Sequence, residues 1–224
     1  MVITLSLSDG GGVSLGAALN YCQCADDSRQ GMEKRLAIFP EEHVYNSRLS
    51  LSGFVMSISL YAASVPVFQQ MLNALNDVLV KAEAHATEKK IQPEALLQAR
   101  LFPDMLPFTR QIQIAVDFAK GASARLAGVE IPKYEDTETT FADLQALIAK
   151  TLAFIASIKP EDVDGKEGIE IVLRPGTDKE KRLNGQAYLL SYALPQFFFH
   201  VTTAYDLLRH NGVEIGKRDY MGKF

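Results

Sequence analysis

An all-α fold, a four-helix bundle with a small β-hairpin inserted before the last helix, is what this 224-residue sequence indicates. Four segments, each roughly 15–20 residues long, repeat apolar residues at steps of three and four, so each would form a helix with one apolar face. A short alternating stretch ahead of the fourth segment predicts the hairpin. Amphipathic helices of this length bury their apolar faces most economically against one another.

The chain changes character at Met56. Residues 1–55 show no sustained helical or strand period, and we predict that they form a poorly ordered N-terminal extension ahead of an alternative start. Residues 56–224 form the predicted helical-bundle domain. Gly10–Gly16 has the spacing G-x-G-x-x-x-G of a dinucleotide-binding loop, but no second strand with an acidic residue follows at the distance that a βαβ unit requires.

The first predicted helix runs from Pro66 to Ala86, with the proline in its first turn. Its apolar face consists of Phe68, Met71, Leu72, Leu75, Val78, Leu79 and Ala82. After a short piece near Pro93 to Gln98, the second predicted helix runs from Pro107 to Leu126. Its apolar face consists of Phe108, Ile112, Ala115, Val116, Ala119, Ala122 and Leu126. Both faces repeat with the helical period and must be covered.

The third helix is predicted to begin at Thr140, because Thr140 and Asp143 have the spacing of a capping box. Its apolar face consists of Phe141, Leu144, Ile148, Leu152 and Ile155. The alternating segment Gly168–Arg174 and a partner strand at Lys181–Leu183 predict the hairpin. The fourth helix, Pro195 to His210, follows an apolar piece, and Gly212 is placed to end it in a left-handed conformation.

Composition and charge exclude several classes of protein. The chain is 47% hydrophobic and 22% charged, as expected for a globular protein with one core. Its net charge of −4 argues against binding nucleic acid through the phosphate backbone. With no apolar run near the roughly 18 residues of a membrane span and no basic segment in Met1–Ser8, we expect a cytosolic protein without membrane contact. Cys22 and Cys24 are expected to be reduced thiols.

The fourth helix also carries a family resemblance. Residues 194–213, LPQFFFHVTTAYDLLRHNGV, and the tail GKRD at 216–219 resemble an uncharacterised domain-of-unknown-function family of the DinB/YfiT-like superfamily. Upstream phrases such as Pro103-Asp104-Met105 and residues 117–121, DFAKG, are similar to the same family. The resemblance implies a DinB-like four-helix bundle, often dimeric. It also implies chemistry of the metal-dependent hydrolase or thiol-transferase type, which uses a histidine triad.

The triad that the resemblance implies is incomplete in this sequence. It needs one donor from the second helix and two donors one turn apart on the fourth. His200 matches one fourth-helix position, but Gln196 stands one turn earlier, and the second helix offers Gln111, about 60° from the centre of its apolar face. Gln113 is predicted to point about 140° away, toward solvent. His210 is about 15 Å of helix rise from His200, so one ion cannot reach both.

Three interpretations of the remaining polar residues stay open. Gln111, Gln196, His200 and Thr203 could line a small-ligand pocket at one end of the bundle core. They could instead satisfy one another at the margin of the core. In the third, a metal is held by His200 with His85 or water completing the coordination. We expect no cofactor, and the sequence does not decide whether the protein is an enzyme.

Other polar residues carry weaker signals. Ser64 and Ser191 lack a G-x-S-x-G pattern, so no serine nucleophile is indicated. Asp117 is expected to form a local ion pair on the polar side of its helix. The tail 217–219 could bind an anion or, as we favour, dock on the bundle through a contact between Arg218 and a carboxylate.

A second apolar strip on the fourth helix bears on assembly. Phe198 and Tyr205 fall within about 20° of each other, away from the main apolar face. Such a strip either lies under the long loops or forms a dimer surface. We therefore expect a DinB-like homodimer that lacks the full metal triad, with at most a small-ligand pocket near His200. The alternative is a metal-dependent hydrolase or transferase of the DinB/YfiT-like type.

Overall fold

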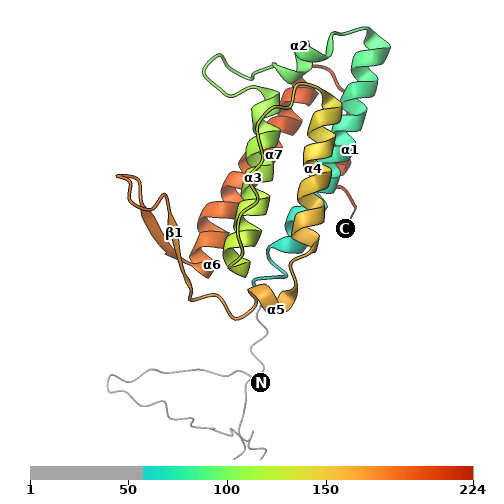
Figure 1. The fold of residues 1–224 in the computed structure, drawn as a ribbon. Helices are drawn as coiled ribbons and strands as arrows, with labels where there is room; N and C mark the ends of the chain where they lie inside the picture. Colours follow the sequence, from blue (N-terminus) through green and yellow to red (C-terminus); the bar gives the residue numbers. More distant parts are fainter. Residues whose placement is uncertain (1–57, 224) are drawn as a thin grey trace, which may run out of the picture. The chain divides into compact units, whose positions relative to one another are not determined.

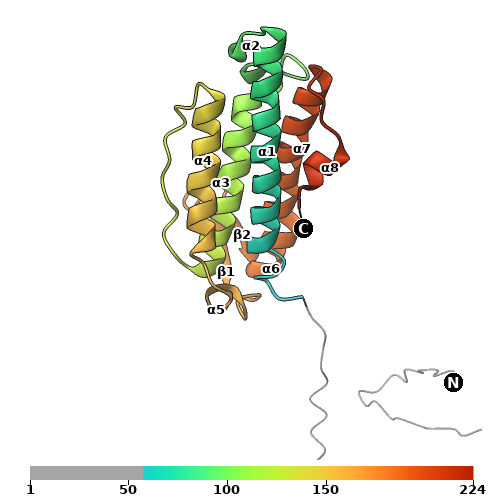
Figure 2. The same cartoon turned by 90° about the vertical axis from the view of Figure 1, so that its right-hand side faces the viewer.

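The computed structural model describes residues 58–223, and these residues form the predicted bundle and hairpin. Its long helices are α1 (Val65–Lys89), α3 (Phe108–Ala127), α4 (Phe141–Ala156) and α7 (Leu194–His210), which lie side by side (Figures 1 and 2). The predicted extension, residues 1–55, lies outside the described residues. None of the helices within 58–223 is long and apolar enough to cross a membrane.

The bundle is not a simple up-and-down arrangement. Helices α3 and α4 run in the same direction, because the loop 128–140 between them returns along the full length of the bundle (Figure 2). Helices α1 and α7 run the opposite way. Helix α3 packs on α4 and α7, and α1 packs on the same two helices, so α1 and α3 lie diagonally opposite. Long crossover connections of this kind occur in several natural four-helix bundles.

The hairpin stands where the sequence predicts it. Strands β1 (Glu170–Leu173) and β2 (Lys181–Asn184) pair antiparallel beside the end of the bundle (Figure 1). A one-turn helix α6 (Gly185–Tyr188) follows, and a π-helical turn η1 (Leu189–Ala193) joins it directly to α7. The sequence shows an apolar piece at this place but gives no sign of the π-helical turn.

Helix ends follow from local sequence. The Oγ1 atom of Thr140 accepts a hydrogen bond from the backbone N–H of Asp143, and the Asp143 carboxylate accepts from the backbone N–H of Thr140, as the capping-box prediction requires. Gly212 has a φ of 88°, in the left-handed region that favours glycine. In the core, Phe68 of α1 meets Phe197 of α7 edge to face, with ring centroids 4.9 Å apart.

Three short helices complete the fold: α2 (Pro93–Leu97), α5 (Pro160–Val163) and α8 (Lys217–Met221). The C-terminal tail docks on the bundle, as predicted, against α1. The ion pair that holds it joins Asp219 to Lys81 and does not involve Arg218, the residue predicted to make the contact. The Nε2 atom of Gln70 also donates to the Met221 carbonyl over 2.9 Å.

Candidate functional site

The packing of α3 against α7 brings Gln111 and His200 together in the interior. Both residues are buried, with 2% of Gln111 and 8% of His200 exposed. The Nδ1 atom of His200 lies 2.7 Å from Oε1 of Gln111. Helical phasing placed both side chains in the core or at its margin, and the structure supplies the contact between them.

A second hydrogen bond fixes the orientation of the Gln111 amide. Its Nε2 atom donates to the Leu106 carbonyl over 3.0 Å. Because that carbonyl can only accept, Oε1 must be the atom that faces His200, and an amide oxygen can only accept as well. The network therefore assigns the hydrogen of the neutral imidazole to Nδ1 and leaves a lone pair on Nε2.

Burial sets the charge of this imidazole. Loss of solvation lowers the pKa of His200 below its usual value of 6.5, so the ring is neutral at pH 7. Phe118 stacks on the ring at 6.1 Å with an angle of 15°, and Phe199 meets it edge to face at 5.2 Å. Within residues 58–223, Nε2 has no hydrogen-bond partner.

The other two residues of the predicted cluster behave differently. The Oγ1 atom of Thr203 donates to the carbonyl of Phe199, one turn back in its own helix, over 2.7 Å. Gln196 is half-buried, and no hydrogen bond joins its side chain to another described residue. The structure thus brings Gln111 and His200 together without drawing Thr203 or Gln196 to them, and the ligand pocket remains a prediction.

With the fold and this pair of residues described, comparison with known proteins becomes informative. A family model described as "Domain of unknown function (DUF1993)" matches residues 60–221. The chain belongs to this family. A crystal structure of a DinB family member protein from Shewanella denitrificans superposes with a TM-score of 0.70 at 42% identity, covering 74% of this chain and 93% of that one. Curated proteins yield no match. The resemblance to an uncharacterised DinB-like family is confirmed.

The described residues do not fit the metal triad of the DinB type. No group of three or more His, Cys, Asp or Glu side chains within residues 58–223 could hold an ion. His85 lines a cavity with Gly212 and Glu214, beyond the C-terminal end of α7. His200 is ten residues, or about 15 Å of rise, before the end of that helix, so the two histidines lie at different levels of the bundle. Cys22 and Cys24 lie outside the described residues.

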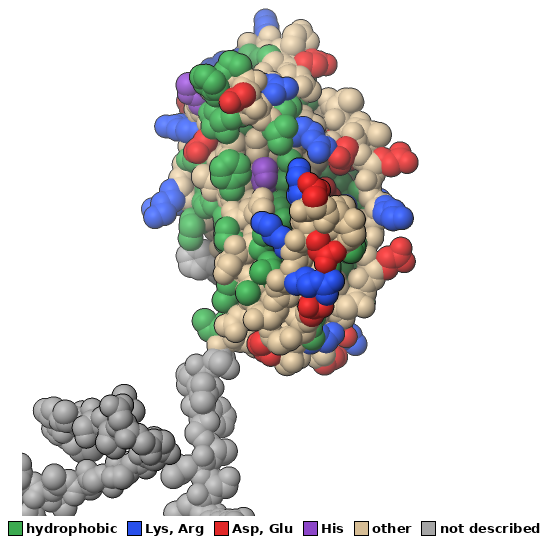
Figure 3. Space-filling model, turned by 90° about the vertical axis from the view of Figure 1, so that its left-hand side faces the viewer, with side chains coloured by type: hydrophobic (Ala, Val, Ile, Leu, Met, Phe, Trp, Pro, Cys, Tyr) green, Lys and Arg blue, Asp and Glu red, His purple; other side chains and the backbone are tan. Residues whose placement is uncertain are grey.

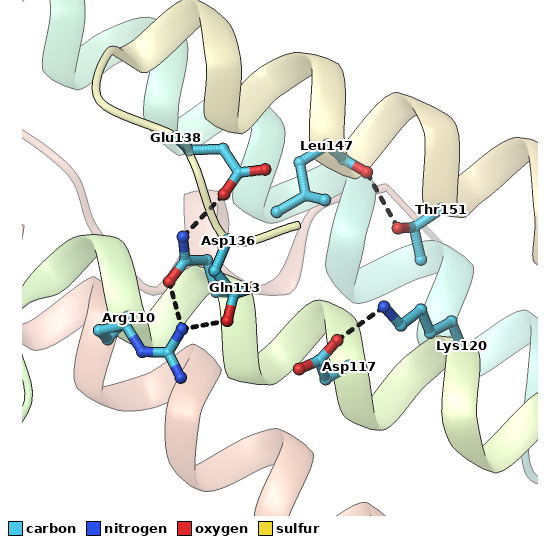
Figure 4. A network of polar contacts seen from close by, with 8 residues as sticks. All are labelled: Arg110, Gln113, Asp117, Lys120, Asp136, Glu138, Leu147 and Thr151. Atoms are coloured by element: carbon cyan, nitrogen blue, oxygen red, sulfur yellow. Dashed lines mark hydrogen bonds and ion pairs between the residues drawn. The ribbon is translucent and has the colours of Figure 1, made fainter. Parts of the chain in front are cut away.

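The expectation that Gln113 points toward solvent is wrong. Only 3% of the surface of Gln113 is exposed in this DUF1993 chain. Its Oε1 atom accepts from Arg110 over 2.8 Å, and its Nε2 atom donates to Glu138 over 2.7 Å (Figure 4). Arg110 also pairs with Asp136, so the crossover loop is bound to the polar side of α3. Helical phasing could not foresee this, because the loop covers a face that would otherwise be solvated.

The sequence did not predict the buried lysine that lies on the same side of α3. Lys120 is 5% exposed and pairs with Asp117 over 2.8 Å (Figure 4). Its Nζ atom also lies 3.9 Å from the ring centroid of Tyr134. Lys150 of α4 lies 3.9 Å from the same ring. Burial raises the pKa of Tyr134, so its phenol stays neutral at pH 7. The local ion pair predicted for Asp117 is confirmed, and these contacts explain how the loop is held in place.

Proposed function

We propose that this DUF1993 protein is a metal-independent binding module, cytosolic and homodimeric, whose site is centred on Nε2 of His200. The observation that supports it most is the pair of hydrogen bonds that runs from the Leu106 carbonyl through Gln111 to Nδ1 of His200. A fixed tautomer turns the ring into a hydrogen-bond acceptor of defined orientation. Because the pKa is lowered, this acceptor is available at neutral pH.

The surroundings of the ring indicate the kind of ligand. An acceptor nitrogen requires an N–H or O–H donor, and the rings of Phe118 and Phe199 beside it favour an apolar body. A small, neutral molecule with one donor group and one flat apolar part meets both conditions. Phenol is the simplest probe of this class.

Nitrogen NMR on protein labelled at histidine tests the proposal. We expect His200 to show a protonated Nδ1, an unprotonated Nε2 and a pKa below 6.5, and we expect phenol to shift the Nε2 resonance. The Gln111→Leu variant removes the acceptor for Nδ1, so the ring should then populate both tautomers. A hydrogen on Nε2 in the unchanged protein, or an Nε2 signal indifferent to phenol, would contradict the proposal.

Exposed apolar side chains near the site support the homodimer. Phe199 is 58% exposed beside His200, and Phe102 and Leu106 are 63% and 43% exposed in the loop that Gln111 tethers. Figure 3 shows one face of the molecule on which hydrophobic side chains lie beside a histidine. Tyr205, by contrast, packs on Tyr220 of α8 with centroids 5.7 Å apart, so that part of the predicted strip is covered by the tail.

The alternative function is metal-dependent hydrolysis or group transfer of the DinB type, with His200 and His85 as ligands. One observation favours it: metal-bound histidines commonly donate their other ring N–H to an oxygen, as His200 does to Gln111. The separation of His85 from His200 opposes it. The metal-independent module therefore accounts for more of the described geometry.

A further inference from the structure

A second cavity, of about 210 Å³, opens between α3, the hairpin and the segment that joins α6 to α7. Pockets for drug-sized ligands have volumes of about 300 Å³ or more, so this smaller cavity would take only a small molecule. The side chains that give it its chemistry are Asp117, Phe118, Arg125, Arg174, Tyr188 and Tyr192.

A glycine inside α3 makes room for one of these side chains. Gly121 is buried in the middle of the helix, where glycine is among the least favourable residues. A Cβ atom at this position would lie 2.7 Å from the Nη1 atom of Arg125. The same nitrogen donates to the hydroxyl of Tyr188 over 3.1 Å. The glycine therefore allows the Arg125 guanidinium to fold back along α3 at the cavity.

Two further departures from regular geometry border the same cavity. The π-helical turn η1 lies directly after Tyr188 and contains Tyr192, and turns of this kind occur often at functional sites. Arg174 has a φ of 51°, which a non-glycine residue seldom adopts, and it does so directly before Pro175. Such conformations persist only where the surrounding structure fixes them, and they cluster at functional sites. Their convergence on one cavity points to a ligand.

The charges and rings of the cavity indicate the chemistry of that ligand. Arg125 and Arg174 contribute positive charge, and no described residue pairs with the Arg174 guanidinium. The one carboxylate in the lining, Asp117, is already paired with Lys120. Tyr188, which is only 1% exposed, stacks on the half-buried Tyr192 with ring centroids 6.0 Å apart at an angle of 25°, so Tyr192 supplies the accessible aromatic surface.

We propose that this cavity binds a small carboxylate carried on a flat apolar ring. The carboxylate lies between the guanidinium groups of Arg125 and Arg174, whose planar forks match carboxylate geometry. The ring lies against Tyr192, the half-buried member of the stacked tyrosine pair. The cavity adjoins His200 through Phe118, but it needs neither the lone pair of His200 nor a metal, so it stands apart from the site proposed above.

Titration of the ¹⁵N-labelled full-length protein with benzoate tests this proposal by NMR. We expect saturable shifts at Arg125 and Tyr188 with a Kd on the order of 1 mM, typical of so small a ligand. Benzyl alcohol lacks the charge and inorganic phosphate lacks the ring, so each should bind at least tenfold more weakly. Equal affinity for either one, or no saturable shift with benzoate at these residues, would overturn the proposal.

The Gly121→Ala variant separates binding from folding. Alanine favours the helix, so Tm should rise by about 2–4 °C, while the added methyl displaces the Arg125 guanidinium and weakens benzoate binding at least fivefold. Gly216→Ala is the matched control, because a Cβ there meets no atom within 4 Å. Arg174→Ala should weaken binding similarly, and His200→Gln should not. Unchanged affinity in Gly121→Ala and Arg174→Ala would refute the assignment.

Discussion

Gln111 orients His200 without charging it. A carboxylate in its place would stabilise the imidazolium and raise the pKa, whereas a neutral amide oxygen fixes the tautomer and leaves burial as the dominant influence. The pair therefore keeps a basic nitrogen neutral and oriented near physiological pH. This is the property on which the proposed binding function rests.

The lowered pKa of His200 predicts how stability depends on pH. In the unfolded chain the ring titrates near 6.5, so below that pH the unfolded state binds more protons than the folded state. The contribution of His200 is thus present above pH 6.5 and is lost as the pH falls toward its folded pKa. His200→Gln should cost about 1–2 kcal/mol at pH 7.5 through lost packing, yet show a shallower loss of stability from pH 7 to 5.

Urea denaturation of the two proteins across that range measures the difference. His210→Gln is the control for the loss of a histidine, because His210 is exposed at the end of α7. If the slopes of the parent protein and His200→Gln coincide, the ring titrates normally and the neutral acceptor is refuted.

Helical phasing revealed part of the site from sequence alone. It placed Gln111 and His200 in the core or at its margin, because their angles to the apolar faces follow from a period of 3.6 residues. It could not give the contact between them, which depends on how α3 crosses α7. Nor could it give the tautomer, which depends on a carbonyl in the loop before α3.

Elements with local signals were predicted well, and those held by distant contacts were not. The capping box of α4, the proline near the start of α1 and the left-handed Gly212 arise from neighbours in sequence. The burial of Gln113 arises instead from the crossover loop, whose path is set by contacts with α3 and α4.

The π-helical turn η1 lacks a sequence signal for a similar reason. Its residues are mostly apolar and helix-compatible, so a continuous α-helix and a π-turn fit the pattern equally. The two kinds of turn differ in where they place Tyr188 and Tyr192 relative to α3 and the hairpin. Local irregularity of this kind is common where a fold carries a functional site.

The bundle as a whole was predictable because four amphipathic stretches admit few arrangements. Their order was not, since the 128–140 loop could connect α3 to either a parallel or an antiparallel neighbour. The sequence also led us to expect a homodimer. The exposed apolar side chains near His200 are the surface on which that expectation can be tested.

Sedimentation velocity tests the homodimer. We expect the protein to sediment as a dimer at micromolar concentration and Phe199→Ser to shift it to a monomer, because a buried aromatic anchor is typical of interface centres. Val80→Ser is the matched control, since Val80 is an apolar side chain 49% exposed on α1 rather than on α7. A monomer at all concentrations, or dissociation by the control alone, would contradict the homodimer.

The metal content of protein purified without a histidine tag decides most directly between a metal-independent module and a metal-dependent enzyme. Elemental analysis should find transition metals far below one ion per chain, with or without added zinc, and no difference between the parent protein and His200→Ala. One ion per chain that disappears in His200→Ala would mean that His200 is a ligand and that a binding module is the wrong description.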